Sequence, residues 1–180
     1  MKIVLFLAEG FEEIEALTVV DILRRGRCEI VTMSVDDKTK IIGKSEIEVF
    51  ADMPFDKKTA LDAEMIILPG GGLGTENIKN SENVIEVVED FSKKGKKISA
   101  ICAAPYVLGI NGVLKGFKAT CYPGFEKFLD GADIVDANVV CDRNIITSKG
   151  PGTAMEFALA ILKELKGAEC EKAVRDGLIY

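Results

Sequence analysis

One cysteine of this chain lies where an α/β protein could carry a nucleophile. Residues Lys97–Ile101 form a short apolar run typical of a buried parallel strand, and the residues from Ala103 onward suit a helix. Cys102 therefore falls at the turn from strand to helix. Ala100 and Ala104, two positions away on either side, are both small. A tight turn with a nucleophile at its apex requires small neighbours, because the flanking backbones nearly touch.

The same turn suggests how the Cys102 thiol could be activated. The first free N–H groups of a helix carry partial positive charge, which favours thiolate over thiol. The alternative is a small buried cysteine that only fills the core, since free cysteine is among the most buried residue types. The turn alone leaves both interpretations open.

The composition narrows the chemistry, because the chain contains no histidine. Ser-His-Asp and Cys-His triads, H-E-x-x-H metalloprotease sites and histidine-ligated zinc are therefore excluded within this chain. Any partner that activates the thiol must be another kind of side chain.

Glu15 is the carboxylate that the pattern places nearest the core. Ala16, Val19, Val20 and Leu23 repeat at helical spacing after the first predicted strand. Glu15 lies four residues before Val19 and shares the packed edge of that helix. A carboxylate that points inward beside the end of a strand requires a partner. A structural salt bridge is the alternative to a role in chemistry.

A glycine loop, Pro69-Gly70-Gly71-Gly72-Leu73-Gly74, follows another apolar run (residues 64–68). Neither G-x-G-x-x-G nor G-x-x-x-x-G-K-[ST] fits this loop, so a nucleotide site is not predicted. Glycines at the carboxyl end of a strand more generally let backbone N–H groups approach a ligand closely.

Length and charge set the protein class. The 180 residues fit one domain, and the net charge of −6 argues against binding to nucleic acid as the main function. No apolar run approaches the length of a membrane span, and the apolar N-terminus fits a first strand better than a signal peptide. Five widely spaced cysteines without a C-x-x-C motif favour free thiols. We expect a cytoplasmic protein that does not bind membranes.

The elements that must position these residues alternate between strand and helix. Apolar runs at residues 2–8, 28–34, 64–68 and 97–101 predict buried strands, and amphipathic segments between them predict helices. Residues 41–50 suggest a small hairpin outside the main sheet, residues 54–62 are expected to be irregular, and Ser81 is expected to cap a helix. Thr153 and Glu156 are predicted to form a capping box. The order predicts a single-domain α/β sandwich with a mostly parallel sheet, covering residues 1–180.

Five ordered motifs together resemble one family. They are AEGFEEIEA (residues 8–16), LPGGGLG (68–74), AICAAP (100–105), TCYP (120–123) and SKGPGTAMEFAL (148–159). They resemble the DJ-1/ThiJ/PfpI superfamily, in particular the branch of small dimeric proteins that includes the parkinsonism-associated deglycase and its bacterial relatives. The resemblance covers essentially the whole chain. It implies a flavodoxin-like α/β/α sandwich related to the class I glutamine amidotransferase fold.

The resemblance also implies roles for single residues. Cys102 matches the family's strained elbow cysteine and Glu15 matches the glutamate that hydrogen-bonds it. Gly71 and Ala103 match two backbone donors of an oxyanion pocket, which Gly70 and Tyr122 would line. Tyr122 stands where human-type members have a histidine, and a phenol is a donor or weak acid at neutral pH rather than a base. Ala103 stands where the peptidase-like branch has a histidine, which points away from proteolysis.

Two functions follow from this set of residues. As an enzyme, the protein would act as a glyoxalase or protein deglycase: Cys102 would attack a 2-oxoaldehyde such as methylglyoxal, or one of its adducts, with Glu15 moving protons. As a non-enzymatic alternative, Cys102 would be a redox sensor, oxidised to sulfinate, in an oxidative-stress protein or chaperone. We expect no cofactor, no metal, a small carbonyl compound or glycated protein as partner, and a homodimer that uses the first helix or the stretch around Cys121.

Overall fold

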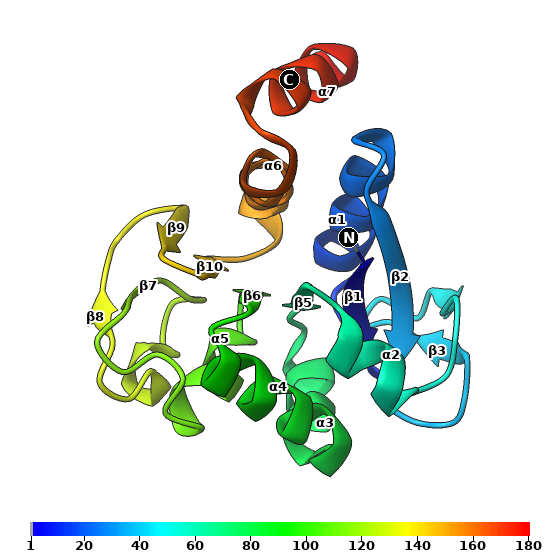
Figure 1. The fold of residues 1–180 in the computed structure, drawn as a ribbon. Coiled ribbons are helices and arrows are strands. Elements are labelled where there is room, and N and C mark those ends of the chain that lie inside the picture. Colours follow the sequence, from blue (N-terminus) through cyan, green and yellow to red (C-terminus); the bar gives the residue numbers. More distant parts are fainter. Residues whose placement is uncertain (1) are drawn as a thin grey trace.

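A parallel sheet runs through the centre of the computed structural model, which describes residues 2–180 (Figure 1). Within these residues the sheet has six strands in the spatial order β2-β1-β5-β6-β10-β9. They are β1 (Lys2–Leu7), β2 (Glu29–Ser34), β5 (Met65–Leu68), β6 (Lys97–Ile101), β9 (Val139–Asp142) and β10 (Ile145–Ser148). The neighbouring pairs are parallel except for β9 and β10, which are antiparallel. The predicted α/β fold with a mostly parallel sheet is confirmed.

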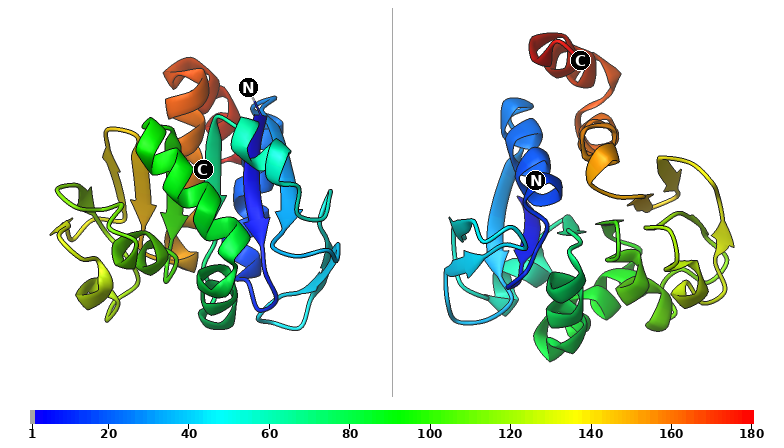
Figure 2. Two further views of the ribbon diagram at one scale, coloured as in Figure 1. Left: turned by 60° about the horizontal axis from the view of Figure 1, so that its bottom comes forward. Right: turned by 180° about the vertical axis from the view of Figure 1, so that it is seen from behind.

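Helices cover both faces of this sheet, as the two views of Figure 2 also show. One face carries α1 (Glu13–Arg25), α6 (Ala154–Lys166) and α7 (Ala168–Leu178). The other face carries α2 (Lys57–Asp62), α3 (Gly72–Asn80), α4 (Glu82–Lys94) and α5 (Pro105–Ile110). Because both faces are covered, the central strands are apolar at nearly every position, as the continuous runs in the sequence predict.

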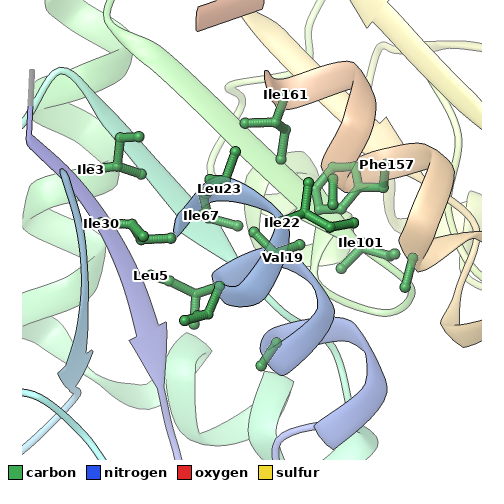
Figure 3. Packing of buried hydrophobic residues seen from close by; sticks show 14 of the residues in the cluster. Ile3, Leu5, Val19, Ile22, Leu23, Ile30, Ile67, Ile101, Phe157 and Ile161 are labelled. Carbon is green, nitrogen blue, oxygen red and sulfur yellow. The ribbon is translucent and has the colours of Figure 1, made fainter. Parts of the chain in front are cut away.

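Alternate residues of each strand enter two separate cores. Ile3 and Leu5 of β1 face the cluster beneath α1 and α6, whereas Val4 and Phe6 face the cluster beneath α4 and α5. Figure 3 shows the first cluster, in which Phe157 of α6 lies beside side chains from α1 and the sheet. A fully buried side chain of this size contributes roughly 1.5–3 kcal/mol. This packing fixes the position of α1, the helix that carries Glu15.

Smaller elements lie beside the main sheet. Strands β3 (Lys40–Ile42) and β4 (Glu48–Phe50) form the predicted antiparallel hairpin, and β7 (Lys118–Ala119) pairs in parallel with β8 (Asp133–Ile134). Short 3₁₀ turns cover Glu126–Phe128 and Pro151–Thr153. The hairpin matters for the site, because its turn reaches the first residues of α1.

Two local predictions concern the elements on the α4 side of the sheet. The predicted cap of α4 is confirmed, since the Ser81 hydroxyl accepts a hydrogen bond from the Val84 N–H. The prediction of an irregular segment at residues 54–62 is wrong, because the Asp56 carboxylate caps the short helix α2 by accepting from the Thr59 N–H.

The predicted capping box at the start of α6 is also wrong. The Thr153 hydroxyl bonds to the Gly150 carbonyl and lies 2.6 Å from the Ser148 hydroxyl. The Glu156 carboxylate accepts instead from the Asn138 amide. Thr153 therefore bonds within the loop before the helix and Glu156 bonds to the residue before β9, so neither side chain caps the first turn of α6.

Among the helices of residues 2–180, none has the length and apolar character needed to cross a bilayer.

Candidate active site

Cys102 lies at the carboxyl end of β6, and its backbone has the left-handed conformation that a sharp elbow requires. Its φ is +64°, a value that non-glycine residues rarely adopt and that costs on the order of 1–3 kcal/mol. Two hydrogen bonds hold the strained residue: the Cys102 N–H donates to the Ser148 carbonyl (2.9 Å), and the Cys102 carbonyl accepts from the Tyr122 N–H (2.8 Å). Ala100 and Ala104 on either side are fully buried. The thiol itself is 9% exposed, at the floor of the site.

Glu15 reaches the same place from α1 and is completely buried. Its Oε2 accepts a hydrogen bond from the Gly70 N–H at 2.7 Å, and the carboxyl group also bonds with the Cys102 thiol. Its Oε1 is buried and receives no hydrogen bond from a nitrogen or hydroxyl group among residues 2–180. The inward placement that the helical pattern predicted is confirmed, and the structure shows the thiol and the Gly70 N–H as the groups that meet this carboxyl.

The glycine loop passes between these two side chains. A Cβ atom on Gly70 would lie 2.6 Å from Cβ of Cys102 and 2.7 Å from Oε2 of Glu15, so only glycine fits there. Gly71 has a φ of +92°, and a Cβ on it would lie 2.3 Å from the Gly10 carbonyl oxygen. The loop is anchored by the Glu12 N–H, which donates to the Gly70 carbonyl (3.0 Å). Close approach of backbone, rather than nucleotide binding, explains these glycines.

The thiol and the carboxyl group share their protons. Burial is the main cause that raises the pKa of Glu15 to about 7, although hydrogen bonds from Cys102 and Gly70 lower it in part. Burial, followed by the Glu15 charge, raises the pKa of Cys102 to about 12. Because the two groups are in contact, they lose their protons one after the other. Between these two pKa values the pair holds a single proton.

Two backbone groups act against burial and the Glu15 charge on the proton of the thiol. The N–H groups of Gly71 and Ala103 bond to the Cys102 sulfur and lower the pKa of the thiol. The family resemblance names the same two groups as donors of an oxyanion pocket. The turn itself had suggested the first free N–H groups of a helix, and that detail is wrong, because α5 begins only at Pro105, beyond the turn. The two N–H groups favour the form in which sulfur is negative and Glu15 keeps the proton.

Tyr122 and Gly150 form the rim above the thiol. The Tyr122 side chain is partly exposed, and its ring lies against Gly150. A Cβ on Gly150 would lie 3.2 Å from the Tyr122 ring and 3.9 Å from the Cys102 sulfur. Sequence reasoning assigned no role to Gly150, although it lies within the SKGPGTAMEFAL motif. A side chain at Gly150 would press on the Tyr122 ring, which would have to shift slightly, whereas the Cys102 sulfur lies at an ordinary contact distance.

Two acidic residues at the start of α1, Glu12 and Glu13, contact the β3–β4 turn, and Lys44 of this turn faces Glu12. Glu12 is 6% exposed, and its Oε2 lies 3.2 Å from Nζ of Lys44 in the β3–β4 turn. Oε1 of Glu13 accepts from the Ser45 N–H at 2.7 Å. Lys44 was also missed from the sequence, since nothing in a local pattern links a hairpin turn to this helix. Within residues 2–180, no three His, Cys, Asp or Glu side chains are grouped to hold a metal ion.

The chain matches known proteins along most of its length. The model of the DJ-1/PfpI family matches residues 1–164. The Parkinson disease protein 7 homologue of Danio rerio is 35% identical over 182 residues, which cover 99% of this chain and 96% of the relative. Protein DJ-1 homologues A and B of Arabidopsis thaliana are 37% and 34% identical, and the matched residues span only 43% and 39% of their lengths.

Two further comparisons bear on the chemistry. The glutathione-independent glyoxalase DJ-1 of Schizosaccharomyces pombe is 32% identical over 188 residues, with 99% of this chain and 98% of the relative covered. The structure of Toxoplasma gondii DJ-1 in its oxidised form superimposes with a TM-score of 0.94 at 33% identity, covering 99% of this chain and 98% of that chain.

Proposed function

The chain belongs to the DJ-1/PfpI family, and on this basis we propose that it is a cysteine-dependent enzyme acting on 2-oxoaldehydes such as methylglyoxal, or on their protein adducts. Cys102 is the nucleophile and Glu15 moves the protons. The observation that carries the proposal is the contact between a buried carboxyl group with a pKa of about 7 and a thiol that faces two backbone N–H groups. The similarity to a glutathione-independent glyoxalase supports the same reaction class.

The first step is addition of sulfur to the aldehyde carbon. The S–C bond forms while the carbonyl π bond breaks, and the electron pair moves to the carbonyl oxygen. The Gly71 and Ala103 N–H groups bond to the sulfur, and in this proposal they would donate to the new oxyanion. The oxygen then takes up the proton that the Cys102–Glu15 pair held. The product is a hemithioacetal on Cys102 beside an ionised Glu15, and no oxidant or reductant is required.

The second step is a proton transfer between the two oxygen-bearing carbons. Glu15 accepts the proton from the former aldehyde carbon and returns it to the neighbouring carbon, which converts the hemithioacetal into a thioester. A carboxyl group with a pKa of about 7 can both accept and donate a proton at neutral pH. Water then cleaves the thioester and releases lactate and the free thiol. With a glycated amine as substrate, the first step differs: the S–C bond would form as the C–N bond breaks, and the amine would leave with the proton of Glu15. The later steps are the same.

The direct test is an aldehyde-turnover assay on the wild type beside Cys102→Ser and Glu15→Ala. Formation of lactate from methylglyoxal by the wild type, and its loss in Cys102→Ser with the fold intact, are the expected results. Turnover that survives the loss of the thiol would contradict the proposal.

A second candidate function is redox sensing by Cys102. The observation that favours it is the close superposition on a relative whose structure is of the oxidised protein. The same backbone N–H groups that face the sulfur would donate hydrogen bonds to the oxygen atoms of a sulfinate. In that case oxidation, rather than turnover, would start an oxidative-stress or chaperone response.

We also propose that the protein acts as a homodimer in the cytoplasm. The α1 helix exposes Ile14 (55%) and Leu17 (38%), and the adjacent hairpin exposes Ile47 and Phe50. Exposed apolar side chains on neighbouring elements suit an interface with a second copy. All five cysteines are free, as expected for a reducing compartment. A monomeric mass in solution would contradict the dimer.

A further inference from the structure

A groove opens beside the thiol site, between the glycine loop and the β3–β4 hairpin. It has a volume of about 430 Å³, and its lining includes Ile42, Gly43, Lys44, Gly72 and Leu73. Gly72 and Leu73 directly follow Gly71, whose N–H group faces the Cys102 sulfur. Gly10, which also lines the groove, packs against Gly71, since a Cβ on Gly71 would lie 2.3 Å from the Gly10 carbonyl oxygen. The groove therefore adjoins the backbone donor of the thiol site.

Lys44 is fixed at the groove by its backbone and brings a positive charge to it. The Lys44 N–H donates to the Phe11 carbonyl at 2.8 Å, so the residue is tied to the segment that leads into α1. Its ammonium group pairs with Glu12 at 3.2 Å, while 62% of its side chain stays exposed. The Glu12 contact raises the pKa of Lys44, and the charges of Cys102 and Tyr122 add to this effect. The ammonium group is thus charged at neutral pH and lies within electrostatic reach of the thiol.

The other walls are mostly apolar. Ile42 and Leu73 are 40% and 61% exposed at the groove, and the glycines between them add no polar side chain. Glu9 also lines the groove, but its Oε2 accepts a hydrogen bond from the Ile42 N–H at 3.1 Å. Glu9 is therefore held at the edge by the hairpin. Lys44 is the cation of the groove, and its side chain stays largely exposed to a ligand although it pairs with Glu12.

We propose that this groove is a subsite for the carboxylate of a small aldehyde acid, with Lys44 as the residue that selects the anion. The inference rests on the proposed function, since it names a substrate class for the same thiol. Glyoxylate, in which the aldehyde and the carboxylate are adjacent, is the simplest member of this class. Its aldehyde carbon would bond to the Cys102 sulfur, the carbonyl oxygen would take up the thiol proton, and the carboxylate would stay intact beside Lys44.

The test measures protection of Cys102 by glyoxylate against alkylation. Iodoacetamide, a neutral reagent, alkylates the thiol by displacement of iodide, and mass spectrometry of the Cys102 peptide gives the rate. Glyoxylate is expected to slow this rate, with a half-protecting concentration that is about three- to tenfold higher in Lys44→Met, because one favourable charge is lost. Lys44→Arg should keep the wild-type value. Raising the ionic strength should weaken the protection of the wild type by glyoxylate, and this measurement requires no variant.

Lys40→Met is the matched control, because Lys40 lies in the same hairpin and also pairs with a glutamate, Glu48, at 2.7 Å. It should leave glyoxylate protection unchanged. The proposal is overturned if glyoxylate protects Lys44→Met as well as it protects the wild type. It is also overturned if Lys40→Met weakens this protection as much as Lys44→Met does. A second readout is the ratio of alkylation rates with iodoacetate and iodoacetamide, which should fall in Lys44→Met. Neither readout requires turnover, so absence of methylglyoxal turnover would contradict the proposed function without deciding this inference.

Discussion

The protein buries two thiols, Cys102 and Cys121, and their surroundings differ in ways that bear on the reactivity proposed for Cys102. Cys102 is 9% exposed and Cys121 is 3% exposed. Burial is the largest cause that raises the pKa of each to about 12. Beyond that they differ: Cys102 meets the Glu15 carboxyl and two N–H groups, whereas the further influence on Cys121 is the like charge of Glu126, which raises its pKa as well.

Burial without partners raises the pKa of a thiol and leaves it mostly protonated and unreactive, as at Cys121. At Cys102 two backbone N–H groups act against burial and favour negative sulfur, and a carboxyl group in contact with the thiol can hold the proton. These partners come from β6, α1 and the loop before α3, which are far apart in the sequence. The reactivity that we propose for Cys102 therefore depends on the fold around it rather than on its exposure.

The largest expected effect separates the two thiols directly. Cys102→Ser should reduce methylglyoxal turnover to the uncatalysed background, because serine at this position has no base strong enough to activate it. Cys121→Ser should retain wild-type turnover. Lactate formation measures both variants, and circular dichroism controls for folding. Equal losses in the two variants would remove the distinction between the thiols.

The next effect tests the carboxyl group. Glu15→Gln should lower the turnover number by about 10²–10⁴, the usual contribution of a general acid–base group. In the wild type, activity should rise as the pH increases through about 7, where the pair loses its first proton. The rise should be absent from the residual activity of Glu15→Gln. A pH profile unchanged by the substitution would show that Glu15 is not the titrating group.

Peroxide sharpens the comparison without any substrate. At low hydrogen peroxide, Cys102 should be oxidised to sulfinate well before Cys121, because oxidation follows thiolate character. Peptide mass spectrometry after a short exposure measures both sites in one sample. Oxidation at the same rate at Cys28, Cys121 and Cys102 would count against a special environment for Cys102.

The smallest expected effect concerns the loop that brings the partners together. Gly70→Ala should lower the free energy of unfolding by about 1–3 kcal/mol, since the added methyl group would overlap Cβ of Cys102 and Oε2 of Glu15. Gly72→Ala is the matched control, because a Cβ there meets no atom within 4 Å. Denaturant unfolding measures both. Equal stability of the two variants would mean that the loop does not pack as tightly as described.

Much of the fold follows from local sequence patterns. The apolar runs of β1 and β5 and the Ser81 cap of α4 are visible in the sequence because each depends on neighbouring residues alone. Two helices were not visible for a physical reason. The α2 segment has a single buried residue, Ala60, and so shows no apolar period, and α3 begins in the glycine loop, where intrinsic helix propensity is low.

The candidate site, like the fold, was predictable only where local sequence patterns place its residues. Cys102 and Glu15 were found because a strand-to-helix turn and an inward-facing carboxylate are local signals. Lys44 and Gly150 were not found, since each reaches the site only through tertiary packing of the hairpin and of the loop after β10. The pKa of the Cys102 thiol could not be predicted from the sequence either. Burial and the Glu15 charge raise it, the backbone N–H groups lower it, and their balance depends on the distances between these groups in the fold.

The central claim is that Cys102 and Glu15 share one proton at neutral pH, and one measurement tests it most directly. The rate of Cys102 alkylation by iodoacetamide is followed against pH in the wild type and in Glu15→Gln. The account predicts that reactivity in the wild type rises with a midpoint near pH 7, where the pair loses its first proton, and that this step disappears in Glu15→Gln. A single step well above pH 9, identical in both proteins, would contradict it.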